Sequence, residues 1–381
     1  MSYPTIRDVA QALETWAPRG SAQSYDNVGL QVGDPDLPVQ RVLIALDLTA
    51  HVIEEAIREN ANLIITHHPT IFKPLRSVTA GSGPAGLVFR LAQAGIALYA
   101  AHTNLDAAPG GVSFALAEQL GLQEVRFLKP FPETLYKLAT FVPASHADAV
   151  REALAQAGAG RIGAYEACAF ATEGIGYFRP TESASPFIGT PGGQLEAVQE
   201  LRIEVEVPRW HLDRVLNALR QAHPYEEVAY DVYPVHQPNT RAGFGAVGRL
   251  PKPEPLPAFL HRVAERLDAE ALRYTGDPSS TVERVAVCGG SGSDLTGDAL
   301  AAGADAYVTA DITYHKFFDV LAPGGTPRMA LIDAGHFETE RIVEELLRRN
   351  LAEHFPDVTW LRTASRTSPI HTYVRPATPP H

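Results

Sequence analysis

One pattern occurs twice in the middle of the chain and restricts the fold of that region more than any other feature. VPASHADAVREALAQA (142–157) and VPRWHLDRVLNALRQA (207–222) share the order V-P-x-x-H-x-D-x-V-x-x-A-L-x-x-A. Each copy follows a short strand-like segment, opens a helix-like segment and is followed by another strand-like region. Two β-α-β units in tandem predict a ferredoxin-like, split β-α-β domain of the α+β class.

The segments on either side of this region alternate between strand-like and helix-like patterns. VLIALDLT (42–49) and NLIITHHP (62–69) read as strands in the first segment, and VERVAVCGG (282–290) and RMALIDAG (328–335) read as strands in the last. This alternation predicts an α/β core with mostly parallel sheets. The similar strand spacing in the two segments indicates a duplicated core, interrupted by the α+β insert.

A length of 381 residues is typical of two or three domains. We expect the first half of the α/β domain at 1–124, the inserted domain at 125–244 and the second half of the α/β domain at 245–381. The net charge of −12 argues against nucleic acid and anionic membranes as partners, because both require a basic surface.

The two cysteines, Cys168 and Cys288, are too few for a disulfide scaffold or a Cys-rich zinc site. The N-terminus lacks the basic start and apolar core of a signal peptide, and no apolar run is long enough to span a membrane. We therefore expect a cytoplasmic protein. The proline-rich end, 375–381, is expected to be a loose tail.

Metal-ligating residue types follow several of the predicted strands. His67 and His68 end one strand, Asp106 follows another, and His336 and Glu340 are four residues apart at the start of a helix. The carboxyl ends of parallel strands meet at one edge of a sheet, so we expect these five groups to converge. Three imidazoles and two carboxylates exceed the needs of one four-coordinate ion and suit two divalent ions per subunit, either Zn, Fe, Mn or Co. Each group alone is also common as a structural hydrogen-bonding residue or helix cap.

His102 and His315 are the candidates for catalytic proton transfer. His102 matches His336 in the duplicated frame, and His315 lies with Asp311 near another strand end. Either histidine could hand a proton to a group near the metals. The alternatives are a strand cap for His102 and a backbone-bonded helix start for His315.

Several motifs together resemble the GTP cyclohydrolase 1 type 2 family, also called the Ngg-interacting-factor-three-like proteins. They are SYDNVGLQVGD (24–34), ITHHPTIF (65–72), HTNLDAAPGGV (102–112), TADITYH (309–315) and DAGHFETE (333–340). The resemblance implies a dinuclear metal site, with ligands that correspond here to His67, His68, Asp106, His336 and Glu340. The middle segment resembles the PII/CutA-like insert of longer bacterial members, which implies a homo-oligomer, either a trimer or a hexameric ring.

Two functions remain open from the sequence. The first is a metal-dependent hydrolase, in which metal-activated water attacks a nucleotide-like substrate; by resemblance this would be GTP ring opening. The second is a non-catalytic, metal-binding regulatory or scaffold protein that acts through its insert. An accessible cleft beside the metals favours the first, and a closed, saturated metal shell favours the second.

Overall fold

A computed structural model describes residues 3–373, so the predicted tail at 375–381 lies outside the described residues. The chain divides into two compact units. Unit 1 combines 1–129 with 242–381, and unit 2 consists of 130–241. The chain is a mixed α/β protein with three sheets, of which two belong mainly to unit 1.

The first sheet of unit 1 has five strands in the order β1-β4-β3-β2-β15. Its strands are β1 (Gly29–Val32), β2 (Arg41–Ala45), β3 (Leu63–Thr66), β4 (Ala97–Ala100) and β15 (Thr359–Arg362). All neighbouring pairs are parallel except β1 with β4. The central strands are completely buried, as expected for a parallel sheet covered on both faces.

The second sheet of unit 1 has six strands in the order β11-β14-β13-β12-β10-β5. Its strands are β5 (Gln123–Phe131), β10 (Asn239–Pro255), β11 (Arg273–Thr275), β12 (Thr281–Ser291), β13 (Ala306–Ala310) and β14 (Ala330–Asp333). The pairs β12–β13 and β13–β14 are parallel, whereas β10–β12 and β11–β14 are antiparallel. The expectation of mostly parallel sheets is therefore wrong for this sheet, because β10 and β11 enter it from connections that reverse the chain direction.

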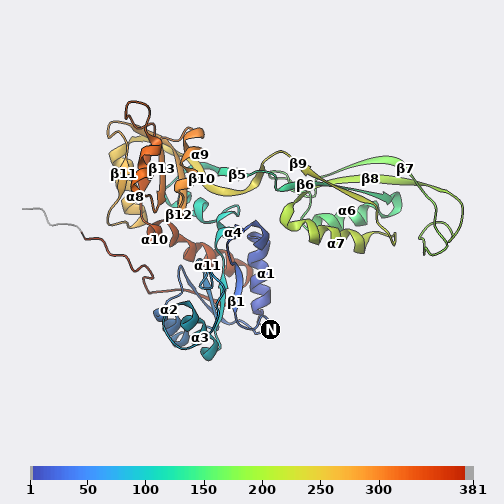
Figure 1. The fold of residues 1–381 in the computed structure, drawn as a ribbon, viewed down its shortest axis with the longest axis horizontal. Helices are drawn as coiled ribbons and strands as arrows, with labels where there is room; N and C mark the ends of the chain where they lie inside the picture. The colour runs from blue at the N-terminus through green and yellow to red at the C-terminus, as the bar shows by residue number, and fades with distance from the viewer. Residues whose placement is uncertain (1–2, 374–381) are drawn as a thin grey trace, which may run out of the picture. The chain divides into compact units, whose positions relative to one another are not determined.

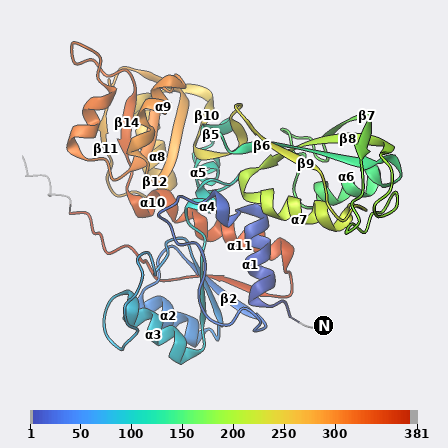
Figure 2. The ribbon, with the colours of Figure 1, turned by 45° about the vertical axis from the view of Figure 1, so that its right-hand side comes forward.

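Helices cover both sheets and separate their cores. They are α1 (Ile6–Trp16), α2 (Ala50–Arg58), α3 (Pro84–Ala94), α4 (Thr103–Asp106), α5 (Val112–Gln119), α8 (Leu256–Leu267), α9 (Thr296–Ala301), α10 (His336–Glu340) and α11 (Ile342–His354). Val343, Leu347 and Leu351 of α11 pack into the core of the first sheet, and Leu116 of α5 packs into the core of the second. In both views α11 lies between the two sheets (Figures 1 and 2).

Unit 2 contains a four-stranded antiparallel sheet and two helices. Its elements are β6 (Leu135–Pro143), α6 (Ala147–Gln156), β7 (Ala169–Phe178), β8 (Glu196–Pro208), α7 (Leu212–Ala222) and β9 (Tyr230–Val235). The strand order β7-β8-β6-β9 is that of the ferredoxin-like, split β-α-β arrangement. Val150 and Leu154 of α6 pack with Val215 and Leu219 of α7 in a core of the unit's own.

Within residues 3–373, none of the helices combines the length and apolar character that crossing a membrane requires.

Candidate metal centre

The paired histidines His67 and His68 follow β3 at the carboxyl edge of the first sheet. Their backbone N–H groups donate to the carbonyls of Ala45 and Leu46 at 3.3 and 3.0 Å. The Thr66 hydroxyl donates to the His68 carbonyl at 2.8 Å and fixes a bend in the chain. Adjacent side chains of a straight strand point to opposite faces, but after this bend the two rings lie with centroids 5.2 Å apart.

Two short helices bring the other side chains to the same place. His102 precedes α4, which ends at Asp106, and α10 begins at His336 and ends at Glu340. The helices follow β4 of the first sheet and β14 of the second, so strand ends of both sheets contribute to the cluster. The structure thus brings together all five side chains predicted to bind metal, and His102 joins them.

Two groups of side chains could each hold a metal ion, and His68 belongs to both. One group is His68, His336 and Glu340, and the other is His67, His68 and His102; within each group the donor atoms lie within 4.8 Å of one another. Nε2 of His68 and Nε2 of His336 are 3.3 Å apart, and each is 2.9 Å from Glu340 Oε2. Ligands about 2.0–2.2 Å from a tetrahedral ion lie about 3.3–3.6 Å apart, so this spacing fits one ion after a small adjustment.

The buried imidazole of His67 lacks a partner on one ring nitrogen. Its Nδ1 lies 2.7 Å from the Ala101 carbonyl oxygen, so Nδ1 carries the proton and Nε2 presents a lone pair. No hydrogen-bond partner meets Nε2 in the described part of the chain. Carboxylate oxygens of Asp106 and Glu340 lie 3.6 and 3.8 Å from it. A proton or a metal ion at Nε2 would stabilise this arrangement, and the two carboxylates accordingly raise the pKa of His67 against the effect of burial.

An acceptor lies beside the Nδ1 atom of every imidazole in the cluster. The pairs are His67 with the Ala101 carbonyl at 2.7 Å, His68 with Asp47 at 2.7 Å, His336 with Asp311 at 2.7 Å and His102 with Asp26 at 2.9 Å. Hydrogen-bonded acceptors of this kind fix the ring orientation and tautomer of metal-binding histidines and leave Nε2 for the ion. The first three contacts are such hydrogen bonds, whereas His102 Nδ1 makes no hydrogen bond within the described residues. Asp47 also accepts a hydrogen bond from the Thr367 hydroxyl at 3.0 Å.

Charges in the cluster are strongly coupled. Burial opposes the charged form of His68, but hydrogen bonds to Asp47 and Glu340 raise its pKa to about 10. The hydrogen bond to Glu340 raises the pKa of His336 to about 9 against the effect of burial. Burial alone would raise the pKa of Glu340, yet the three imidazoles around it hold that pKa well below its ordinary value. The carboxylates therefore stabilise positive charge at Nε2, whether a proton or a metal ion supplies it.

A cavity of about 500 Å³ opens beside the cluster. Its lining includes His102, Asp106, His336 and Glu340 from the cluster. Tyr25, Phe244 and three residues at the end of β12, Gly289, Ser291 and Gly292, form other parts of the wall. This volume lies within the range of small-molecule sites, so the cluster borders a space that a substrate could enter.

His315 belongs to neither of the two possible metal-binding groups. It lies exposed in the 3₁₀ helix η5 (Tyr314–Val320), where its ring contacts Tyr314 with centroids 5.3 Å apart, and it does not line the cavity. Asp47 is a residue that sequence reasoning missed. Its signal was available, because Asp47 follows the strand β2 at the same sheet edge as His67.

Sequence relatives match nearly the whole chain. The family model described as Duf34/NIF3 (NGG1p interacting factor 3) matches residues 4–369. A GTP cyclohydrolase 1 type 2 homolog from Bacillus subtilis is 42% identical over 346 residues, which are 91% of this chain and 91% of the relative. A protein of the same name from Halalkalibacterium halodurans is 40% identical over 373 residues, 98% of each chain.

Solved structures match over the same extent. The crystal structure of a Bacillus cereus protein related to NIF3 has a TM-score of 0.83 and 38% identity, and the match covers 98% of this chain and 100% of that one. The Staphylococcus aureus protein SA1388 has a TM-score of 0.76 and 30% identity, with coverage of 98% and 100%. Both fold and sequence are therefore shared over both units.

Proposed function

This chain belongs to the Duf34/NIF3 family, and we propose that it is a metal-dependent hydrolase that acts on a nucleotide-like substrate. The observation that carries the proposal is the buried His67 Nε2, which faces two carboxylates without a hydrogen-bond partner among residues 3–373. The proposed ligands of two divalent ions are His67, His68, Asp106, His336 and Glu340. Zn, Fe, Mn and Co all suit this set of imidazoles and carboxylates.

Bound by these five side chains, divalent ions would supply Lewis acidity and an activated water for hydrolysis. The chain's own residues prepare the site, because Asp47 and Asp311 hold the outer ring nitrogens of His68 and His336. His102 lines the cavity with Nδ1 beside Asp26, so its other nitrogen is placed to take up or return a proton. The proposed proton-transfer role of His315 has no support from its exposed position.

The cavity supports a nucleotide-like substrate through its shape and lining. Tyr25 lies 64% exposed at the cavity, where its ring is available to stack on a planar base. Gly289 and Gly292 also line the cavity. The relatives' name, GTP cyclohydrolase 1 type 2 homolog, makes GTP the first substrate to test.

The test combines metal analysis with an activity panel on the full chain. Wild-type protein loaded with Zn, Mn or Fe would be assayed with GTP, other nucleotides and phosphodiesters, following formate and phosphate release. We expect His67→Ala to lower the bound metal from about two ions to about one or fewer and to reduce turnover by about 100-fold or more. His354→Ala, on an exposed histidine of α11, is the matched control and should change neither quantity.

The two open functions give different results in this test. Turnover that survives in His67→Ala at reduced metal content would contradict a hydrolase that uses this site. Metal binding that depends on His67 without turnover of any substrate would instead support the regulatory or scaffold role. Activity of His315→Ala decides whether that exposed side chain takes part.

We also propose that the protein forms a homo-oligomer through unit 2. Ile162, Tyr165 and Phe170 are apolar or aromatic side chains of this unit and are 50%, 75% and 66% exposed. Contact between copies commonly covers such side chains. Light scattering of the full chain should give the mass of a trimer or hexamer, and the mass of a single chain would contradict the proposal.

A further inference from the structure

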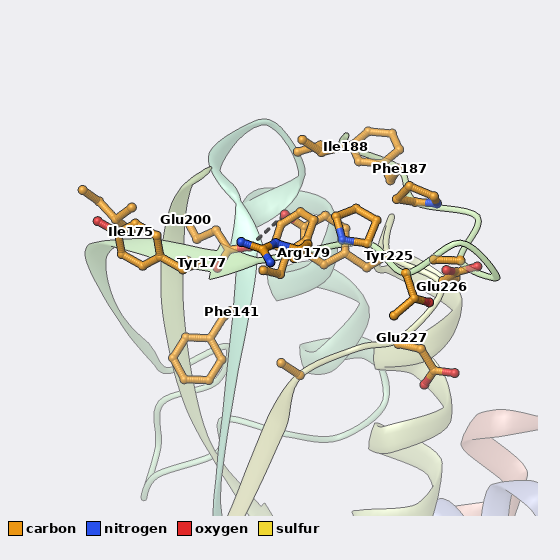
Figure 3. Close-up of a pocket in the computed structure, with 17 residues that line it drawn as sticks. Phe141, Ile175, Tyr177, Arg179, Phe187, Ile188, Glu200, Tyr225, Glu226 and Glu227 are labelled. Atoms are coloured by element: carbon orange, nitrogen blue, oxygen red, sulfur yellow. Dashed lines mark hydrogen bonds between the residues drawn. The ribbon is translucent and has the colours of Figure 1, made fainter. Parts of the chain in front are cut away.

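A second cavity, of about 560 Å³, lies entirely within unit 2. One part of its wall comes from the end of β7 and from β8, and another comes from the loop after β7 and the segment before β9 (Figure 3). It shares no lining residue with the cavity at the candidate metal centre. The proposed hydrolysis gives it no role.

The carboxylate of Glu200 is the buried polar group of this cavity. Glu200 is 9% exposed, and its Oε1 accepts a hydrogen bond from the Tyr225 hydroxyl at 2.8 Å, as the dashed line in Figure 3 shows. A Cβ atom at position 176 would overlap Oε2, so Gly176 makes room for the carboxylate on the neighbouring strand. No ion pair involves Glu200 in the described residues, and Oε2 accepts no hydrogen bond there. A buried carboxylate without a cation is costly, so the site is suited to a ligand that supplies one.

Contacts with His223 fix the position of Tyr225. Its backbone N–H donates to Nδ1 of His223 at 3.1 Å, and Nε2 of His223 lies 2.9 Å from the Phe141 carbonyl oxygen. These two contacts define a neutral imidazole with its proton on Nε2. The hydroxyl that orients the Glu200 carboxylate is thus fixed before any ligand binds, which lowers the cost of ordering the site.

Aromatic rings line the cavity together with the carboxylate. The ring of Tyr225 lies 5.8 Å from that of Phe178 and 6.3 Å from that of Phe187, measured between centroids, and Tyr177 also lines the cavity. The faces of aromatic rings carry partial negative charge and attract organic cations. Rings and carboxylate together therefore favour a positively charged head group with an apolar body.

The other charges in the lining also favour a cationic ligand. Glu226 and Glu227 add two carboxylates, and Arg179 is the cation that the lining contains. No ion pair joins Arg179 to Glu200 within the described residues. Glu226 accepts a hydrogen bond from the Ser185 N–H at 2.8 Å, which ties the loop after β7 to the segment before β9. An anionic ligand would meet three carboxylates and one guanidinium, so the balance of charge disfavours it.

We propose that this cavity binds an organic cation, with an ammonium or amidinium head against Glu200 Oε2 and an apolar body against the rings of Phe187 and Tyr225. The site is separate from the candidate metal centre. It gives unit 2 a binding function of its own, so a ligand of this class would be sensed or held by the inserted unit.

Three probes of matched shape and different charge test the proposal on the full chain. Benzamidine is cationic at neutral pH, benzamide is neutral and benzoate is anionic. Isothermal titration should show benzamidine binding about tenfold or more tightly than either of the others, because it alone can pair with a desolvated carboxylate. Glu200→Gln should weaken benzamidine by about tenfold or more and leave benzamide unchanged.

Matched variants separate recognition from folding. Glu173→Gln changes an exposed carboxylate of β7 that does not line the cavity, and it should bind benzamidine like the wild type. Arg179→Ala should bind benzamidine as well as or more tightly than the wild type. Equal binding of benzamide and benzamidine, preferred binding of benzoate, or no binding of benzamidine would each overturn the proposal. The probe series needs only wild-type protein, so it decides the matter even if Glu200→Gln fails to fold.

Discussion

Each imidazole in the candidate metal centre depends on the acceptor that holds its outer nitrogen. Asp311 illustrates this best, because it adopts a positive φ of 54°, a conformation that few non-glycine residues adopt, and accepts the His336 Nδ1–H at 2.7 Å. The uncommon backbone conformation aims the carboxylate at His336. We infer that Asp311 positions His336 and does not itself bind the ion.

Asp311→Ala should weaken divalent-metal binding by about 10- to 100-fold, because the His336 ring loses its fixed orientation. Asp311→Asn should lose less, since asparagine tolerates this backbone conformation and keeps an acceptor oxygen. Titration calorimetry with Zn or Mn would measure both. Asp319→Ala removes an exposed carboxylate of η5 and is the control; equal affinity of Asp311→Ala and the wild type would refute a positioning role.

The convergence of these side chains could be predicted at the residue scale, but their supporting contacts could not. His67, His68, Asp106, His336 and Glu340 follow predicted strands, and parallel strands end at a common edge. The bend after Thr66 depends on a hydrogen bond from the Thr66 hydroxyl to the His68 carbonyl, which no local sequence pattern predicts. Asp47 reaches His68 from a different strand, so its role depends on strand order, which the sequence leaves open.

At the scale of elements, the irregular end of β12 shapes the cluster as much as the helices do. Gly290 has a φ of +60°, and a Cβ atom there would overlap Oε1 of Glu340. The Gly290 N–H also donates to the Thr339 hydroxyl at 3.0 Å, and this hydrogen bond joins the end of β12 to α10. The glycine therefore allows β12 and α10 to approach closely enough for Glu340 to face the histidines.

Gly290→Ala should displace Glu340 and reduce the bound metal, because both the backbone conformation and the overlap oppose a side chain at this position. Gly297→Ala is the matched control: this glycine lies in α9, has open space around it and should gain a little stability from alanine. Metal content after dialysis would measure the difference. Full metal content in Gly290→Ala would show that the end of β12 can shift away from Glu340 without loss of metal binding.

Helix α11 carries a carboxylate whose ionisation the fold disfavours. Burial raises the pKa of Glu344 from 4.5 to about 7, although its Oε1 accepts the Leu46 N–H at 3.2 Å. The folded state binds the proton of Glu344 more tightly than the unfolded state does. The protonated carboxyl therefore contributes fully to the free energy of unfolding below pH 4.5, and this contribution is lost as the pH rises to about 7. Glu344→Gln should remove this loss.

The free energy of unfolding of Glu344→Gln should therefore exceed that of the wild type above pH 7, by at most about 3 kcal/mol, and the difference should shrink toward pH 4.5. Urea denaturation at several pH values would measure it. Glu353→Gln, on an exposed carboxylate of the same helix, should show no such trend. A difference between Glu344→Gln and the wild type that does not vary with pH would contradict the assignment.

Local periodicity predicts many elements of unit 1, but not the sheet to which each belongs. The alternation at 42–69 corresponds to β2, α2 and β3, whereas β15 joins the same sheet from the far end of the chain. The edge strand β5 lies in the second sheet, although the strand before it in sequence, β4, lies in the first. Pairing between distant segments is decided by packing of the whole unit, which a local pattern does not contain.

At the scale of the whole molecule, the two units have separate cores and separate candidate sites. The side chains of the candidate metal centre all belong to unit 1, and the core around α6 and α7 belongs to unit 2 alone. A ligand stabilises only the part of a protein whose folding creates its site. Metal binding should therefore stabilise one unit without stabilising the other.

Scanning calorimetry of the full chain should accordingly show two transitions, only one of which moves to lower temperature when a chelator removes the metal. Leu219→Ala opens a cavity in the core of unit 2 and costs about 2–5 kcal/mol, so it should lower the other transition and identify it. In Glu340→Gln, the temperature of the metal-sensitive transition should no longer change when the chelator is added. If both transitions moved together with chelator and with Leu219→Ala, the units would unfold as one cooperative body, and the metal would stabilise the entire chain.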